Sequence, residues 1–138
     1  MQVRDDGTLR IGHSHEVIDE LLAALEHGHE FSVHLNLPNR GTIEGVGAEH
    51  NVEIPVTLRR GAIERPLVRF GNFALTAEVE RVATEQTLIA RAAVEGDRGT
   101  LVDALAMDAL VPNRDIAERL VKEMTLYQRD YINPALLR

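Results

Sequence analysis

The segment Asn36-Leu37-Pro38-Asn39-Arg40-Gly41-Thr42-Ile43, with Val52-Glu53-Ile54-Pro55-Val56 after it, sets the architecture that this sequence predicts. Pro38 to Gly41 has the composition of a tight turn, because Pro pre-sets φ and Gly or Asn tolerates a positive φ. Apolar and polar residues alternate over 31–36 before this turn and over 52–58 after it. We therefore predict two half-buried strands joined through a loop that contains Gly45 and Gly47.

An amphipathic helix is predicted ahead of the first strand. Its apolar residues recur at helical spacing between Val17 and Leu25, and Gly28 supplies the expected stop. Ser14 is the expected N-cap, with Glu16 in the first turn near the positive end of the helix dipole. Residues 1–13 are predicted to form a loop or a frayed strand.

A short hairpin and three helices are predicted after the second strand. Arg60-Gly61 is the expected turn, and residues 63–68 form its partner strand, which Pro66 places at an edge or ends early. Helices are expected from a Thr76 cap to Gly96, over about 99–109, and after an Asn113 cap. The second carries its inward residues at Leu101, Ala104 and Leu105. The third has one apolar face, made of Ile116, Leu120, Met124 and Tyr127.

This order predicts an α+β fold with helices packed on one face of a small antiparallel sheet. The 138 residues are expected to form a single domain, 1–138. The net charge of -7 and an aromatic content of 4% argue against nucleic acid and anionic membranes as partners. With no cysteine, no signal peptide pattern and no apolar run of transmembrane length, we expect a cytoplasmic location.

The six histidines all lie within the first fifty residues, at positions 13, 15, 27, 29, 34 and 50. Histidine is a common metal ligand, so a small metal-dependent enzyme is one hypothesis. No H-E-x-x-H motif supports it, and exposed residues at helix ends are the simpler interpretation for most of them. The arginines at 60, 65 and 69 form either a local anion site or a solvated sheet edge.

Asn36, Asn39 and Gly41 are the best candidates for a binding element. Amide side chains both donate and accept hydrogen bonds, which suits sugar hydroxyls. The alternative is that Asn39 only stabilises the turn. Gly45-Val46-Gly47 weakly resembles a dinucleotide fingerprint, but no helix is predicted directly after it, so no nucleotide site is expected in this chain.

With its flanks, the opening segment resembles the carboxy-terminal domain of the NAD-dependent glycosidases of glycoside hydrolase family 4. The ordered motifs are Asn36 to Ile43, Val52-Glu53-Ile54-Pro55, and the later residues Gln86, Leu88, Ala92-Ala93, Gly96-Asp97-Arg98, Ala104-Leu105 and Asp108 with Leu110. The opening His13-Ser14-x-Glu16 is most similar to the α-galactosidase and α-glucosidase branch. The resemblance covers about residues 12–130. The sequence departs from the family pattern at Gly45 to Gly47, Ala74, Thr87 and Ala109.

The resemblance implies a fold like the carboxy-terminal domain of lactate and malate dehydrogenases. It also implies hydrolysis of glycosidic bonds by oxidation and elimination, with NAD and a divalent metal, usually manganese, in the full-length family. The family's NAD loop and metal ligands precede the matched region. No catalytic, cofactor-binding or metal-binding residue is therefore assigned here, and neither NAD nor metal is expected on this chain alone. The expected substrate-binding residues are His13, Asn36, Asn39 and Arg40.

Two hypotheses about partners follow from the resemblance. In the first, the chain is the carboxy-terminal part of a glycosidase that acts on sugar or sugar-phosphate glycosides; it is inactive alone and pairs with a Rossmann-domain subunit. In the second, the chain is a non-catalytic module for sugar binding or oligomerisation. Apolar faces on the helix from Thr76 to Glu95 and on the last helix would then be exposed or paired in a homo-oligomer.

Overall fold

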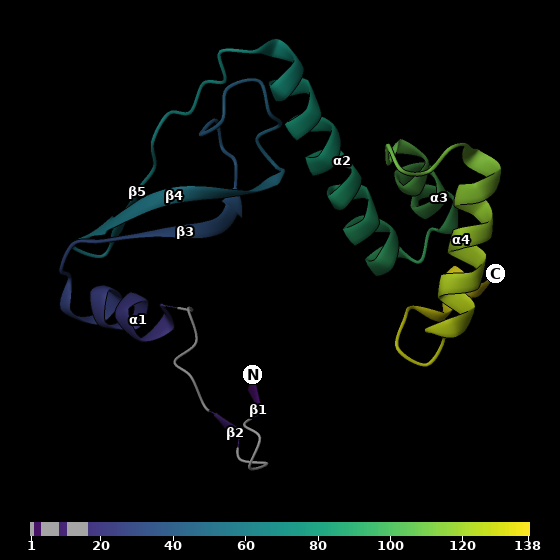
Figure 1. The fold of residues 1–138 in the computed structure, drawn as a ribbon, viewed down its shortest axis with the longest axis horizontal. Helices are drawn as coiled ribbons and strands as arrows, with labels where there is room; N and C mark the ends of the chain where they lie inside the picture. The colour runs from purple at the N-terminus through teal and green to yellow at the C-terminus, as the bar shows by residue number, and fades with distance from the viewer. Residues whose placement is uncertain (1, 4–8, 11–16) are drawn as a thin grey trace. The chain divides into compact units, whose positions relative to one another are not determined.

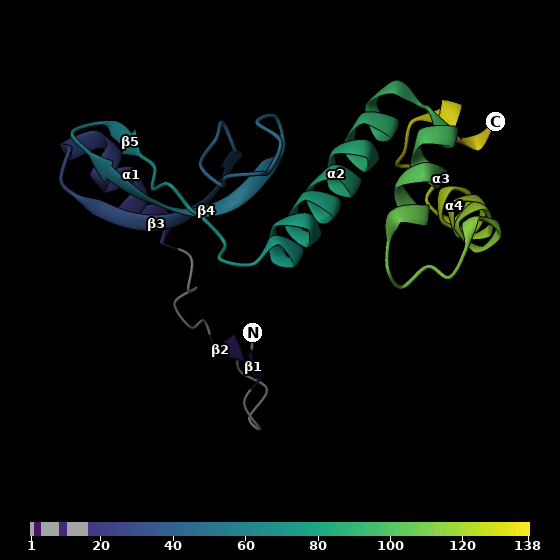
Figure 2. The same ribbon diagram turned by 90° about the horizontal axis from the view of Figure 1, so that it is seen from above.

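A computed structural model describes residues 2–3, 9–10 and 17–138 of the chain. The predictions for His13, Ser14 and Glu16 fall outside the described residues. The chain divides into two compact units, one formed by Met1–Leu35 with Ile54–Pro66 and the other by Asn36–Glu53 with Leu67–Arg138. The elements of both are drawn in Figure 1 and, from above, in Figure 2.

The first unit begins with two short strands and a helix. β1 (Gln2–Val3) pairs antiparallel with β2 (Leu9–Arg10), and α1 runs over Ile18–His27. Gly28 ends α1 as predicted, with φ 72°, and its backbone N–H donates to the Ala24 carbonyl. Only Ala24 of α1 is buried, and the apolar side chains of Ile18, Leu22 and Leu25 are about half exposed.

The predicted antiparallel sheet is present, with strand order β3-β4-β5. β3 spans Phe31–Pro38, β4 spans Asn51–Arg59 and β5 spans Ala62–Glu64. In β4 every second residue from Val52 to Leu58 is buried, which confirms the alternation in the sequence. The hairpin turn is Arg60-Gly61, with φ 51° and 78°, the left-handed pair that a two-residue hairpin favours. β5 ends before Pro66, so the predicted partner strand over 63–68 is too long.

The long helix of the second unit begins earlier than predicted. α2 spans Phe73–Glu95, and its N-cap is Asn72, whose side-chain oxygen accepts a hydrogen bond from the Ala74 backbone N–H at 2.9 Å. Thr76, the expected cap, lies in the first turn. Gly96 ends α2 with φ 73°, as predicted. Among the alanines of α2, Ala83 and Ala92 are buried, whereas Ala90 and Ala93 are exposed.

The remaining helices follow α2 closely, and α3 packs between α2 and α4 (Figure 2). α3 spans Arg98–Met107, α4 spans Arg114–Tyr127, and a 3₁₀ helix, η1, spans Pro134–Leu137. Asn113 caps α4 as predicted, by accepting from the Ile116 N–H at 3.0 Å. None of the helices that the structure describes has the length and apolar character needed to cross a membrane.

The apolar face predicted for the last helix is largely exposed, and the buried face lies beside it. α4 buries Ala117, Val121 and Thr125, and the first two join Val102 of α3 in the core. The small side chains of this face allow α3 and α4 to approach closely. The bulkier side chains of the neighbouring face would hold the two helices further apart. Leu120, Met124 and Tyr127 are 37%, 52% and 91% exposed.

We expect part of the stability of the second unit to be lost in acid through Asp97, the N-cap of α3. Hydrogen bonds from the Thr100 hydroxyl and backbone N–H hold the pKa of Asp97 below its ordinary 3.8. A carboxyl with a lowered pKa contributes stability that is complete above the unfolded value and is lost as the pH falls through the folded value. Urea unfolding at pH 5 and at pH 3 checks this expectation. Asp97→Asn keeps a capping oxygen and should lose less stability between the two pH values than the wild type; an equal loss would contradict this assignment.

Candidate functional site

The loop over 39–50 of the second unit carries most of the predicted site. Its base is closed by two backbone hydrogen bonds, from Asn39 N–H to the His50 carbonyl at 2.8 Å and from Arg40 N–H to the Ala48 carbonyl at 2.9 Å. Ile43 forms a parallel bridge with Val68, through bonds of 2.7 and 3.0 Å on either side. The loop is thus tied at both its base and its middle.

Asn39 is the internal support of this loop. Its side chain has no exposed surface, and its Nδ2 donates to the carbonyls of Ile43 at 3.0 Å and Val46 at 2.7 Å. Its Oδ1 accepts from the Ile43 N–H at 2.6 Å. One buried amide therefore satisfies three backbone groups that water cannot reach. Asn39 therefore has the turn-stabilising role that was one of the two alternatives from the sequence. Contact between Asn39 and a sugar stays a prediction.

Asn36 and Arg40 present polar groups on the outside of the same segment. Both are exposed, and Arg40 takes φ 47° while Gly41 takes φ 84°. The sequence favoured Gly or Asn for the positive φ, and Gly41 adopts it, together with Arg40. Among the described residues Arg40 makes no ion pair, so its guanidinium is available to an anion or to sugar hydroxyls.

His50 was missed by the sequence analysis, which grouped it with exposed histidines. His27, His29 and His34 are indeed exposed, but His50 is only 6% exposed. Its Nδ1 lies 2.8 Å from Thr87 Oγ1, and that hydroxyl donates its own hydrogen to the Ala83 carbonyl. Nδ1 must therefore carry a proton and donate it to Thr87.

The other side of the His50 ring faces two more groups of α2. Nε2 lies 3.3 Å from Thr84 Oγ1 and 3.3 Å from Glu80 Oε1, while Glu80 Oε2 accepts from the Gly47 N–H at 2.8 Å. This cluster fastens the loop to α2. Positions 80, 84 and 87 fall on one face of a helix, a polar spacing that could have indicated it.

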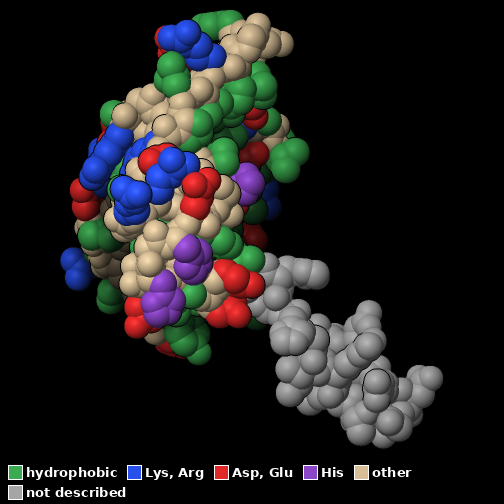
Figure 3. Space-filling view, turned by 90° about the vertical axis from the view of Figure 1, so that its left-hand side faces the viewer, with side chains coloured by type: hydrophobic (Ala, Val, Ile, Leu, Met, Phe, Trp, Pro, Cys, Tyr) green, Lys and Arg blue, Asp and Glu red, His purple; other side chains and the backbone are tan. Residues whose placement is uncertain are grey.

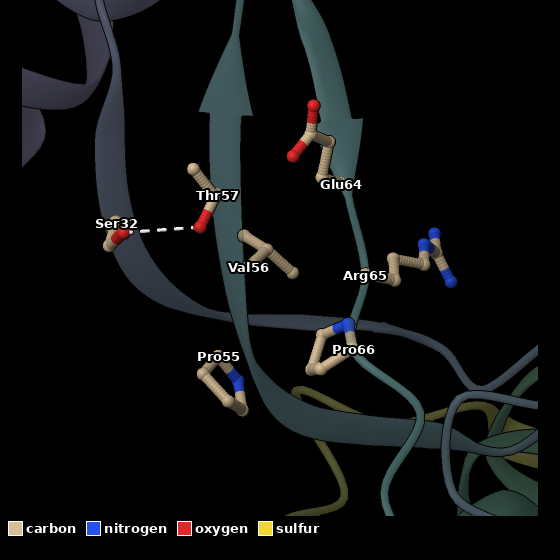
Figure 4. Close-up of a pocket in the computed structure, with 7 residues that line it drawn as sticks. All are labelled: Ser32, Pro55, Val56, Thr57, Glu64, Arg65 and Pro66. Atoms are coloured by element: carbon tan, nitrogen blue, oxygen red, sulfur yellow. Dashed lines mark hydrogen bonds between the residues drawn. The ribbon is translucent and has the colours of Figure 1, made fainter.

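A shallow pocket lies on the first unit, on the sheet (Figure 4). Its volume is about 370 Å³, and it is lined by Ser32, Pro55, Val56, Thr57, Glu64, Arg65 and Pro66. Ser32 Oγ and Thr57 Oγ1 are 3.2 Å apart, and Thr57 is the register partner of Glu64. The pocket thus offers two hydroxyls, a carboxylate and a guanidinium beside proline rings. Of the predicted substrate-binding residues, Asn36, Asn39 and Arg40 do not line it, whereas Arg65 of the predicted arginine group does.

Of the predicted arginine group, Arg69 forms an ion pair with a nearby acid, and so does Arg59, which lies beside the group. Arg69 pairs with Glu44 at 2.6 Å, and Arg59 at the hairpin pairs with Glu30 at 2.9 Å and Glu64 at 3.7 Å. Figure 3 shows acidic side chains interspersed among the basic ones, with exposed histidines nearby. This mixture favours a solvated sheet edge over a strongly basic patch.

The described residues do not include a group that fits a metal or a dinucleotide. Within the part of the chain that the structure describes, no group of three or more His, Cys, Asp or Glu side chains could hold a metal ion. Gly45-Val46-Gly47 lies in the loop and leads into β4, not into a helix N-terminus that could face a pyrophosphate.

The small antiparallel sheet and the helices that follow it define an α+β domain with an internally supported polar loop. The sequence over residues 3–111 matches the family described as the Family 4 glycosyl hydrolase C-terminal domain. The chain therefore belongs to this family. No curated protein sequence matches it.

Solved structures share the fold across most of the chain. A 6-phospho-alpha-glucosidase from gut microorganisms, solved with NAD and glucose-6-phosphate, has a TM-score of 0.80 and 22% identity and covers 89% of this chain. The 6-phospho-beta glucosidase from Thermotoga maritima, solved with manganese, NAD+ and glucose-6-phosphate, has a TM-score of 0.72 and 22% identity and covers 85%. The match spans only 29% of the length of each of these enzymes. The resemblance to a family 4 carboxy-terminal domain, with its lactate dehydrogenase-like fold, is confirmed.

Proposed function

We propose that this chain is the carboxy-terminal part of an NAD- and divalent-metal-dependent glycosidase. The observation that carries the proposal is the family match over residues 3–111. The matched structures hold NAD, manganese or glucose-6-phosphate, and about seven-tenths of their length lies outside the match. We assign the cofactor and metal to that remaining part, because the described residues here fit neither. A cytoplasmic location is part of the proposal.

The contribution of this chain to the reaction is one wall of the sugar site. Asn36 presents an amide that can donate to one hydroxyl and accept from another. Arg40 presents a guanidinium, whose fork suits a phosphate or a pair of hydroxyls. Asn39 and His50 act behind them by holding the loop in one conformation, which lowers the entropic cost of binding. His13 stays a predicted member of this wall.

The isolated 138-residue chain is expected to hydrolyse no glycoside. With NAD+, manganese and a nitrophenyl glucoside or 6-phosphoglucoside, release of nitrophenol should stay at the rate without protein. The physical reason is that the residues which the structure describes include no cofactor site that could accept a hydride and no metal site that could polarise the sugar oxygens. Release of nitrophenol well above that rate would contradict the proposal.

A positive control makes this expectation informative. The same assay is run with the chain mixed with the NAD-binding part of a family 4 enzyme, and the mixture should gain activity. Asn36→Ala or Arg40→Ala should then reduce kcat/KM about tenfold to a hundredfold, since each removes hydrogen bonds to bound substrate. Lys122→Ala, a matched exposed change on α4, should leave kcat/KM unchanged.

The second candidate function is a non-catalytic sugar-binding module, and the pocket on the first unit favours it. Its Ser32 and Thr57 hydroxyls and Glu64 carboxylate are groups that bind sugars, and proline rings give the apolar contact that a sugar's C–H face requires. Saturation-transfer NMR with glucose and glucose-6-phosphate tests it. Saturable binding that Thr57→Val removes would favour the module, and no transfer would exclude it.

The partner follows from the proposed function. We infer that a Rossmann-domain polypeptide, either a separate subunit or a continuous chain, completes the enzyme, and that the substrate is a sugar or sugar-phosphate glycoside. A homo-oligomer is compatible with both candidate functions.

A further inference from the structure

The pocket on the first unit has the size of a site for one small molecule. Its volume of about 370 Å³ lies near the lower end of the range of roughly 300–1,000 Å³ that small-molecule sites span. All the residues that line it belong to β3, β4, β5 or the two positions after β5, so they lie within one unit. The pocket therefore depends on the geometry of the sheet alone.

Two hydroxyls in the pocket share a single hydrogen bond. Ser32 Oγ and Thr57 Oγ1 are 3.2 Å apart, and either of them can donate. Neither hydroxyl has another partner within the described residues. Because two hydroxyls carry two hydrogens and their mutual bond uses one, the pair keeps one donor and several acceptor lone pairs for a ligand. Sugar hydroxyls, which also donate and accept, match this pair.

Glu64 adds a negative charge beside the hydroxyls. It is the register partner of Thr57, and its carboxylate lies on the side of β5 that faces β4 (Figure 4). Its Oε1 is 3.7 Å from Arg59 Nε, but Arg59 has a closer partner in Glu30, at 2.9 Å. Among the described residues Glu64 Oε2 has no partner, so this oxygen can accept a hydrogen bond from a ligand.

The positive charge that lines the pocket is directed elsewhere. Arg65 comes directly after Glu64, and its guanidinium extends away from Ser32 and Thr57 (Figure 4). A guanidinium is the group best suited to bind a phosphate. A phosphate at the two hydroxyls would instead meet the Glu64 carboxylate. The charge at this place therefore favours a cationic ligand over an anionic one.

We propose that the pocket binds an amino sugar, that is, a pyranose that carries a protonated amine. The amine donates to Glu64, ring hydroxyls bond with Ser32 and Thr57, and the C–H face of the ring lies against the proline rings. This inference rests on the second candidate function, the sugar-binding module. A neutral hexose makes the same contacts without the charge, and a hexose phosphate adds a charge that Glu64 repels.

The expected binding is weak but selective. The pocket is shallow and offers few polar groups, so the dissociation constant should be on the order of millimolar. The Glu64 side chain is 55% exposed, and an ion pair at such a site changes affinity by about fivefold at most. Glucosamine should therefore bind about fivefold more tightly than glucose, and glucose-6-phosphate more weakly than glucose. High salt should reduce these differences.

Saturation-transfer NMR titrations with these three sugars test the order of affinity, near pH 6 so that the amine is protonated. Glu64→Gln keeps a hydrogen-bonding side chain but removes the charge. It should lower the affinity for glucosamine to that for glucose and leave glucose binding almost unchanged. Glu26→Gln is the matched control, because it makes the same charge change at an exposed position on α1 and should keep the preference for glucosamine.

Thr57→Val separates failure of this inference from failure of the module. The variant lacks one hydroxyl of the pair and should lose transfer to all three sugars, while its amide spectrum stays that of the wild type. If glucosamine and glucose bind equally and Thr57→Val removes both, the module stands and the amino-sugar inference is overturned. Transfer to none of the sugars overturns both. Transfer that survives Thr57→Val, or a preference that Glu26→Gln removes as fully as Glu64→Gln does, also overturns the inference.

Discussion

Asn39→Ala is expected to lower the free energy of unfolding by about 3 kcal/mol. The substitution removes the side chain that satisfies the carbonyls of Ile43 and Val46 and the N–H of Ile43. These groups are buried, so they would lose their partner without gaining water, which is the costly case for a hydrogen bond. Chemical denaturation at neutral pH measures the change, and hydrogen exchange at the Ile43 amide should accelerate in parallel.

Asn36→Ala is the matched control for this prediction. It deletes the same amide from the same segment, but Asn36 is exposed, so the unfolding free energy should change by less than about 0.5 kcal/mol. Asn39→Asp is the second test, since a carboxylate accepts from Ile43 but cannot donate to the two carbonyls. It should destabilise as strongly as the alanine. Equal stability of the Asn39→Ala and Asn36→Ala variants would show that Asn39 does not support the loop.

Gly96→Ala is expected to cost about 3 kcal/mol for two separate reasons. Gly96 has φ 73°, a conformation that an L side chain rarely adopts. A Cβ there would also lie 2.5 Å from the Ala135 Cβ and 3.0 Å from the Asn133 Nδ2. The tail that carries η1 would have to move, and with it the bond from Asn133 Nδ2 to the Val94 carbonyl. Thermal and chemical unfolding measure the loss.

Alanine substitutions at two other glycines measure the backbone strain and the steric clash separately. Gly41 has φ 84° and nothing within 4 Å of a built Cβ, so Gly41→Ala should show the backbone cost alone, about 1 kcal/mol. Gly71 has neither feature, and Gly71→Ala should be neutral or slightly stabilising. A Gly96→Ala variant no less stable than the Gly41→Ala variant would mean that the tail does not pack against the end of α2.

Most elements could be predicted because their signals are local. The alternation that produces β4, the glycines that end α1 and α2, and the Asn113 cap each depend on residues within one turn or strand. The start of α2 could not be found this way. Phe73 is 86% exposed, so it does not extend the amphipathic pattern of the helix toward Asn72. The pattern therefore predicts the cap at Thr76, whereas the structure has it at Asn72.

The burial of His50 and the choice of the buried face of α4 could not be predicted for a different reason, since both depend on tertiary contacts. α4 carries two apolar faces side by side, and periodicity alone cannot tell which of them α3 covers. The buried ring of His50 contacts Thr87 and Glu80, which lie thirty or more positions later in the sequence. The family was recognised because its motifs occur in a fixed order, which does not require knowledge of these contacts.

Native mass spectrometry of the protein isolated from its source cells tests whether this chain completes a family 4 glycosidase. We expect the chain to be bound to, or continuous with, a polypeptide that carries NAD, whether one or two copies of the chain are present. Finding the chain only as a species of 15.3 kDa or its multiples, with no NAD-bearing polypeptide, would contradict it.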